Sequence, residues 1–102
     1  MTKNEKREHG DVLYEAILTL KDLEECKKFF SDLCTVAELR AMEQRFEVAM
    51  LLSDGMIYND ILERTGASSA TISRVNRSLQ YGADGYQALL PRIKEKLGGD
   101  GI

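Results

Sequence analysis

Apolar residues recur at helical spacing along most of the chain, in blocks that are separated by short polar stretches. The first block, over residues 11–33, predicts two helices that meet near Leu20. Thr35 and Glu38 have the spacing of a capping box, in which each side chain bonds the backbone amide of the other residue. They predict the start of a third helix, whose apolar positions continue to about Ser53.

The next block predicts two short helices joined by a tight turn. The first covers residues 58–64, and Gly66 after it can adopt the left-handed backbone that such a turn needs. Ser68 or Ser69 can cap the second helix by accepting a hydrogen bond from one of its free amides. Three apolar residues of the second helix are expected to face the core: Ile72, Val75 and Leu79. This pattern is typical of a helix-turn-helix.

A last helix is expected over residues 84–97, with Asp84 as its N-cap and with Pro91 kinking it or ending its first part. The chain therefore predicts about six helices and no strands, an all-α fold. Its 102 residues are enough for a single domain. Within that domain we expect dimerisation helices over 8–54 and a helix-turn-helix over 57–80, before the C-terminal helix.

The outward face of the helix after Gly66 carries side chains with which helices read duplex DNA. Small and hydrogen-bonding residues at its start suit base edges in the major groove, and the arginines that follow suit phosphates. We therefore predict double-stranded DNA as the partner. The residues expected to meet base edges and thymine methyl groups are Ser69, Ala70, Thr71 and Ser73. The expected phosphate contacts are Arg74, Arg77 and Asn59, and Ser68 at the cap completes the predicted DNA-binding set.

The net charge of −3 conceals an uneven distribution. Residues 1–63 carry 8 basic and 14 acidic side chains, whereas residues 64–97 carry 6 basic and 2 acidic ones. The expected reading helix contains Arg74 and Arg77 and no acid. The position of the charge thus favours DNA binding over the alternative, in which the imbalance only keeps the chain soluble.

The sequence offers little to metal binding or catalysis. Cys26 and Cys34 are eight residues apart, roughly 12 Å along one helix, too far for a disulfide within it, and they belong to no metal-spaced cluster. We expect reduced, partly buried thiols. With one histidine, His9, no base beside either cysteine and no phosphate-binding glycine loop, we predict that the protein is not an enzyme and takes no cofactor.

No apolar run reaches the roughly 18 residues of a membrane span, and residues 1–8 lack the apolar core of a signal peptide. We therefore expect a cytoplasmic protein with no membrane partner. The helices over 11–33 carry more apolar residues than one small helix-turn-helix unit can cover, and such stripes usually close a dimer. A homodimer would also present two reading helices about 34 Å apart, at successive major grooves.

Several segments together resemble the Trp repressor superfamily, and within it the YerC/YecD-type branch of bacterial proteins. The resemblance covers about residues 33–79 and is strongest over 35–40 (TVAELR), 48–52 (VAMLL) and 66–74 (GASSATISR). The residues 79–86, with LQYG followed by GY, resemble the branch more than the Trp repressor itself. The resemblance implies an intertwined, all-helical homodimer whose N-terminal helices interlock, with a helix-turn-helix reading head on each side.

In the Trp repressor, tryptophan lies between the reading helix and the core, held by two arginines beside a glycine that makes room. The resemblance places Arg74 at the second arginine and Gln44 at the first, Val75 at the glycine, and Cys34 at a threonine that helps hold the amino group. It therefore implies a degenerate pocket, in which the stiff Val75 side chain fills the slot of the indole. We expect no tryptophan corepressor.

Two points follow for the arginines. Arg45, next to Gln44, would replace the missing arginine only after a rotation of its helix that takes Phe46 out of the core. Arg74 is then a phosphate contact or a surface ion pair.

The leading interpretation is a sequence-specific transcriptional regulator, a repressor that occludes a promoter and is not controlled by tryptophan. The sequence identifies no other effector. The alternative is a helical protein-interaction module without specific DNA binding. Binding to random duplex DNA at low salt separates the two, because a module with a net charge of −3 and no DNA-binding role should show none.

Overall fold

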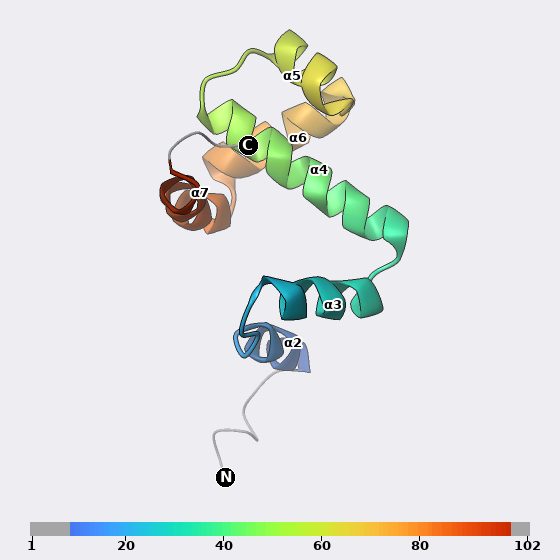
Figure 1. The fold of residues 1–102 in the computed structure, drawn as a ribbon. Coiled ribbons are helices and arrows are strands. Elements are labelled where there is room, and N and C mark those ends of the chain that lie inside the picture. The colour runs from blue at the N-terminus through green and yellow to red at the C-terminus, as the bar shows by residue number, and fades with distance from the viewer. Residues whose placement is uncertain (1–8, 99–102) are drawn as a thin grey trace. The chain divides into compact units, whose positions relative to one another are not determined.

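The computed structural model describes residues 9–98, which form six α-helices and no strand (Figure 1). The helices are α2 (His9–Ile17), α3 (Leu23–Leu33), α4 (Val36–Ser53), α5 (Tyr58–Thr65), α6 (Ser69–Tyr81) and α7 (Gly85–Lys96). The predicted all-α fold is confirmed. Residues 1–8 lie outside the described residues. They are the segment judged to lack the apolar core of a signal peptide, and they include the first position of the expected dimerisation helices. None of the described helices is both long and apolar enough to cross a membrane.

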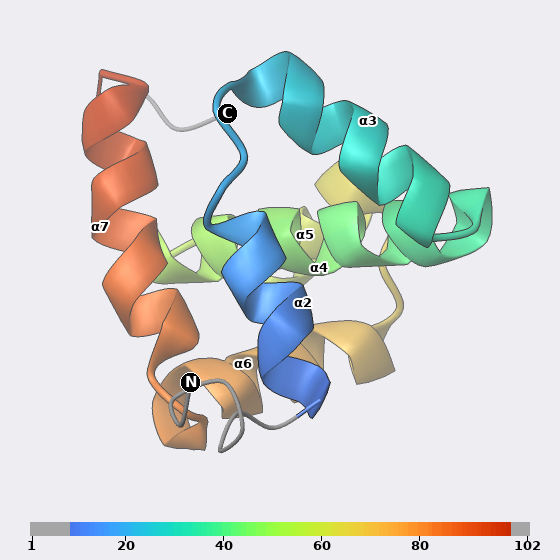
Figure 2. The same cartoon turned by 90° about the horizontal axis from the view of Figure 1, so that it is seen from below.

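The chain divides into two compact units within α4, Met1–Leu39 and Arg40–Ile102. In the first unit, α2 and α3 are joined by residues 18–22 (Figure 2). Asp22 caps α3 by accepting a hydrogen bond from the Glu25 amide at 2.9 Å. None of the described residues of this unit is buried, and Leu18 is 79% exposed. The apolar side chains that the sequence placed here are therefore at most half-buried.

The capping box at the start of α4 is confirmed. The Glu38 N–H donates to Thr35 Oγ1 at 3.1 Å, and the Thr35 N–H donates to Glu38 Oε1 at 2.8 Å. The bond from the Thr35 backbone, and after it the Thr35 side chain, favour the charged carboxylate and hold the pKa of Glu38 below its ordinary value of 4.5.

This lowered pKa makes the start of α4 sensitive to acid. The folded pKa lies below the unfolded one, so the cap contributes stability above pH 4.5 and loses it as pH falls through the folded pKa. We expect the Thr35 amide resonance to move with the titration of Glu38 and the first turn to fray in acid. Glu38→Gln keeps an acceptor oxygen and should abolish this dependence. An amide titration by NMR from neutral to acid pH tests it, and identical curves for the two proteins would contradict the assignment.

The core of the second unit forms on the C-terminal half of α4, around which α5, α6 and α7 are grouped (Figure 1). Its buried residues are Val48, Ala49, Met50, Leu51, Ile61, Ala67, Ile72, Val75 and Leu90. Ile61 from α5 and Ile72 from α6 are both fully buried. Burial of one such side chain contributes about 1.5–3 kcal/mol. The helix-turn-helix is therefore held to α4 by its apolar side.

The connection from α6 to α7 is short, and the two helices meet at residues 82–84 (Figure 2). The Gly82 N–H bonds the Ser78 carbonyl at 3.0 Å. A Cβ atom at Gly82 would clash with the same oxygen, so the position admits only glycine without a shift of backbone.

The side-chain cap expected of Asp84 does not form, and of the two effects expected of Pro91, a kink or an end, the end of the helix does not occur. Asp84 stands at the N-cap position but has a left-handed backbone, with φ of 70°, and its side chain forms no capping hydrogen bond. Pro91 lies inside α7, which continues to Lys96 instead of ending. The helix is held on both sides of the proline, because Leu90 is buried in the core and Lys94 bonds Ser53 at the end of α4.

Candidate nucleic-acid interface

The turn between α5 and α6 is fixed by backbone and side-chain bonds together. Gly66 has φ of 73° and ψ of 6°, the left-handed conformation expected of it, and its N–H bonds the Leu62 carbonyl at 2.9 Å. The Thr65 hydroxyl donates to the Ile61 carbonyl at 2.8 Å and accepts the Ala67 N–H at 3.1 Å. Since Ala67 is buried, the turn is anchored in the core.

The cap of α6 is Ser68 and not Ser69, the two residues between which the sequence left the choice open. Ser68 Oγ accepts the Thr71 N–H at 3.1 Å, and its hydroxyl donates to Thr71 Oγ1, also at 3.1 Å. The first turn of α6 is thus closed by side-chain bonds at the end that we expect to meet DNA.

Most of the predicted DNA contacts lie on the surface. The exposed ones are Asn59, Ser68, Ser69, Ala70, Ser73, Arg74 and Arg77. Thr71 is less accessible than these residues: it is half-buried, and its hydroxyl oxygen accepts a hydrogen bond from Ser68. Asn76, farther along α6, is also half-buried: its Oδ1 accepts a bond from Gln80 at 3.3 Å and it lines a pocket beside α7.

The electrostatics of α6 suit an anion. Its first turn contains no acidic residue, so no side chain offsets the partial positive charge at its N-terminus. Arg74 and Arg77 add two exposed positive charges farther along the same helix. Backbone amides and guanidinium groups both bind phosphate oxygens, so the helix is suited to lie against a DNA backbone.

A small pocket of about 270 Å³ opens between α4 and the start of α6. Its lining residues are Ala41, Gln44, Arg45, Ala70, Thr71 and Arg74. The sequence brought Gln44 and Arg74 together correctly but missed Arg45. No rotation of α4 is needed, because Arg45 lines the pocket while Phe46 still packs against the core. Two consecutive residues of α4, Gln44 and Arg45, both reach the pocket.

The other two residues of the expected degenerate pocket are not among those that line this one. Val75 is 2% exposed and belongs to the core, and its side chain is not among those that line this pocket. Cys34 is the half-buried C-cap of α3, in the first unit. Both Cys26 and Cys34 are free and partly buried, as expected.

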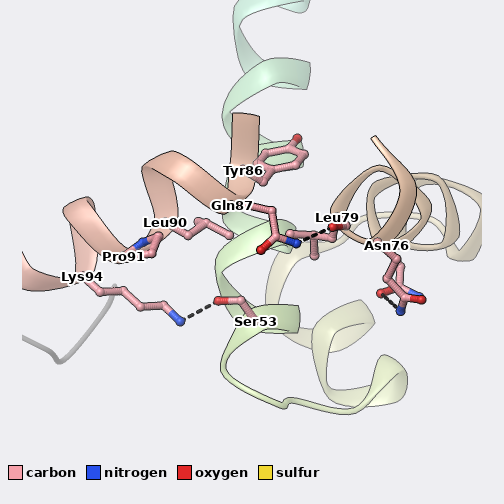
Figure 3. A pocket seen from close by; sticks show the side chains of 9 residues that line it. Ser53, Asn76, Leu79, Tyr86, Gln87, Leu90, Pro91 and Lys94 are labelled. Carbon is pink, nitrogen blue, oxygen red and sulfur yellow. Dashed lines mark hydrogen bonds between the residues drawn. The ribbon is translucent and has the colours of Figure 1, made fainter. Parts of the chain in front are cut away.

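A larger pocket of about 520 Å³ lies between the ends of α4 and α6 and the helix α7 (Figure 3). Lys94 donates to the hydroxyl of Ser53 and pairs with Asp54, which ties α7 to the end of α4. Gln87 donates to the Leu79 carbonyl at 2.7 Å. These bonds hold α7 on the side of α6 that carries Leu79. Among the described residues, no three histidine, cysteine or acidic side chains are grouped to hold a metal ion.

A capped helix with an exposed small, polar and basic face, following a left-handed turn and packed on a shared core, defines a helix-turn-helix protein. The chain belongs to the Trp repressor protein family, whose model matches residues 8–94. This family consists of regulatory DNA-binding proteins and not of enzymes, so membership indicates a DNA-binding regulator.

Individual relatives agree with this assignment. The chain is 55% identical over 85 residues to the uncharacterized protein YerC of Bacillus subtilis (strain 168), covering 83% of this chain and 82% of the relative. It is similar to the crystal structure of a candidate Trp repressor from Staphylococcus aureus, with a TM-score of 0.82, 47% identity and coverage of 92% and 95% of the two chains. A TrpR-like protein from Eubacterium eligens ATCC 27750 gives a TM-score of 0.79 and 52% identity, over 94% and 95% of the two chains. The predicted family and branch are confirmed.

Proposed function

We propose that this protein is a sequence-specific transcriptional regulator that represses by occluding a promoter. The observation that carries the proposal is the exposed face of α6, where small hydrogen-bonding residues are followed by arginines without any acid. The hydrogen bonds of the turn and of the Ser68 cap hold the start of that helix in place.

Each exposed residue then has a role in a major-groove complex. Ser69, Ala70 and Ser73 meet base edges or thymine methyl groups, together with the methyl of Thr71. Phosphates are held by Arg74, Arg77 and Asn59, with Ser68 at the helix start, and these contacts set the register of the helix on the duplex.

The experiment is selection of bound sequences from a random duplex pool. We expect a consensus to emerge and to bind at least about 10³-fold more tightly than scrambled duplex at physiological salt. A protein-interaction module, the alternative function, would enrich no consensus and would not bind random duplex even at low salt. That result would refute the proposal.

We further propose a homodimer held by residues 11–52. The apolar side chains of the first unit support it, because Val12, Leu18 and Leu23 are exposed in the single chain and no described residue there is buried. Sedimentation at micromolar concentration should give a dimer, and Leu18→Glu should shift it toward the monomer, since a charge would be buried without a partner. A stable 11.5 kDa species for the unmodified chain would contradict the dimer.

DNA binding by this protein should not depend on L-tryptophan. The small pocket is lined by two alanines, a threonine, a glutamine and two arginines. This lining includes no aromatic or branched aliphatic side chain that could pack against an indole. Its volume of about 270 Å³ also lies below the roughly 300–1,000 Å³ of most ligand pockets. Gln44 is already engaged with the Thr65 carbonyl, and its neutral carboxamide cannot hold a carboxylate as a guanidinium does.

Titration calorimetry with L-tryptophan, run beside a DNA mobility-shift assay, measures both halves of this prediction. We expect no micromolar isotherm and no change of DNA affinity. A micromolar isotherm, or a several-fold gain in DNA affinity on adding the amino acid, would show that Arg45 and Arg74 rebuild the corepressor clamp.

A further inference from the structure

One polar side chain of α4, in addition to the apolar core, contacts the helix-turn-helix. Gln44 donates from Nε2 to the carbonyl oxygen of Thr65 at 3.2 Å, a partly buried bond between residues 21 positions apart. Thr65 is the last residue of α5, where backbone carbonyls have no partner within the helix. The Gln44 carboxamide supplies a donor to one of these carbonyls.

Thr65 passes this constraint to α6. Its hydroxyl bonds both Ile61, inside α5, and the amide of Ala67, inside the turn. Ser68, the cap of α6, follows Ala67 directly. A displacement of the Thr65 backbone would therefore move the start of α6, and the bond from Gln44 opposes that displacement.

On α4, the bond lies beyond the fully buried residues. The buried side chains of α4 run from Val48 to Leu51, and Gln44 lies one turn before Val48 on the same helix face. At the level of Gln44 the neighbours across from α4 are the small pocket and the first residues of α6. The apolar contacts of residues 48–51 and the polar contact of Gln44 hold the helix-turn-helix at two levels of α4, so that together they oppose its rotation on this helix.

We propose that Gln44 is a positioning residue, which holds the helix-turn-helix against α4 through the Thr65 carbonyl and presets α6 for DNA without a bound small molecule. The inference rests on the proposed function, because its principal readout is DNA affinity. Gln44 itself touches no DNA in this scheme.

The test uses two matched substitutions. Gln44→Met keeps the length of the side chain and removes its donor. Gln87→Met is the control, because Gln87 also donates its Nε2 to a backbone carbonyl, that of Leu79, but between α7 and α6 and away from the turn (Figure 3). Each full-length protein is denatured, refolded in buffer alone to remove small molecules, and assayed where circular dichroism shows that all remain folded.

Gln44→Met should bind its selected duplex about three- to tenfold more weakly, the range for loss of one hydrogen bond. The salt slope should stay the same, because every phosphate contact remains. Amide exchange should accelerate at Ala67 and Thr71 but not in α7, whereas Gln87→Met should bind as the unmodified protein does. A purely structural role would lower the unfolding midpoint and leave the affinity of the folded protein and the turn amides unchanged.

Several results would overturn the inference while the proposed function stands: equal losses in the two variants, full affinity in Gln44→Met, or refolded unmodified protein that binds only after a small-molecule extract is added. Absence of sequence-specific binding by the unmodified protein would overturn both. If Gln44→Met does not fold, NMR of the refolded unmodified protein decides, since the Gln44 side-chain amide should show proximity to the Gly66 amide, and lack of it would refute the bond.

Discussion

Ile72→Ala should destabilise the protein by about 2–5 kcal/mol, the usual cost of truncating a fully buried isoleucine. Against a total stability of roughly 5–15 kcal/mol, this is a large fraction. Ile72 is fully buried and joins α6 to α4 and α5 in one core, so its loss should also loosen the reading helix. Urea unfolding at a fixed protein concentration measures the change.

Ser73→Ala is the matched control for stability, because Ser73 is the next residue of α6 and is exposed. Its effect on the unfolding free energy should stay within about 0.5 kcal/mol. Equal destabilisation by the two substitutions would mean that α6 does not present the faces described above.

DNA affinity, in contrast to stability, should depend on the exposed face of α6. Ser73→Ala or Thr71→Ala should cost about 1–3 kcal/mol on the selected duplex, with little change on random DNA, because each removes a contact to bases. Ser73 is the cleaner probe, since Thr71 also accepts the Ser68 hydroxyl. Arg77→Ala should weaken binding to both duplexes alike and reduce the salt slope by about one unit, because it removes a phosphate contact.

Affinities for the selected and random duplexes over a salt series measure these effects. The reverse pattern, in which Arg77→Ala alters sequence preference while Ser73→Ala and Thr71→Ala are silent, would contradict the placement of α6 in the groove.

Local signals in the sequence were sufficient for most of the second unit. Gly66 and the spacing of Ile72 and Val75 encode the turn and its buried face within a few residues, and the structure bears them out. The Thr35–Glu38 capping box is equally local and was also correct. Such features depend on neighbours that the sequence itself displays.

Features that depend on tertiary packing could not be predicted from such local patterns. Asp84 has the residue type of a cap, but its backbone is left-handed and its side chain forms no capping hydrogen bond. Pro91 was expected to kink its helix or end the first part of it, yet α7 continues past it, with Leu90 beside it buried in the core.

The pocket beside α6 was misjudged for a related reason. A correspondence of single positions left Arg45 out of it, whereas the packing of α4 on α6 determines which side chains reach it. The bond from Gln44 to Thr65 was likewise invisible, because it joins residues 21 positions apart through a backbone carbonyl that no side-chain pattern reveals.

The central claim is that α6 reads DNA with its exposed N-terminal face. The most direct measurement is NMR mapping of amide shifts on adding the selected duplex to the isotopically labelled protein. We expect the largest changes over residues 68–77, with smaller ones near Asn59 at the start of α5. Changes centred on α7 and the larger pocket, or no changes at duplex concentrations that should saturate the protein, would contradict the account.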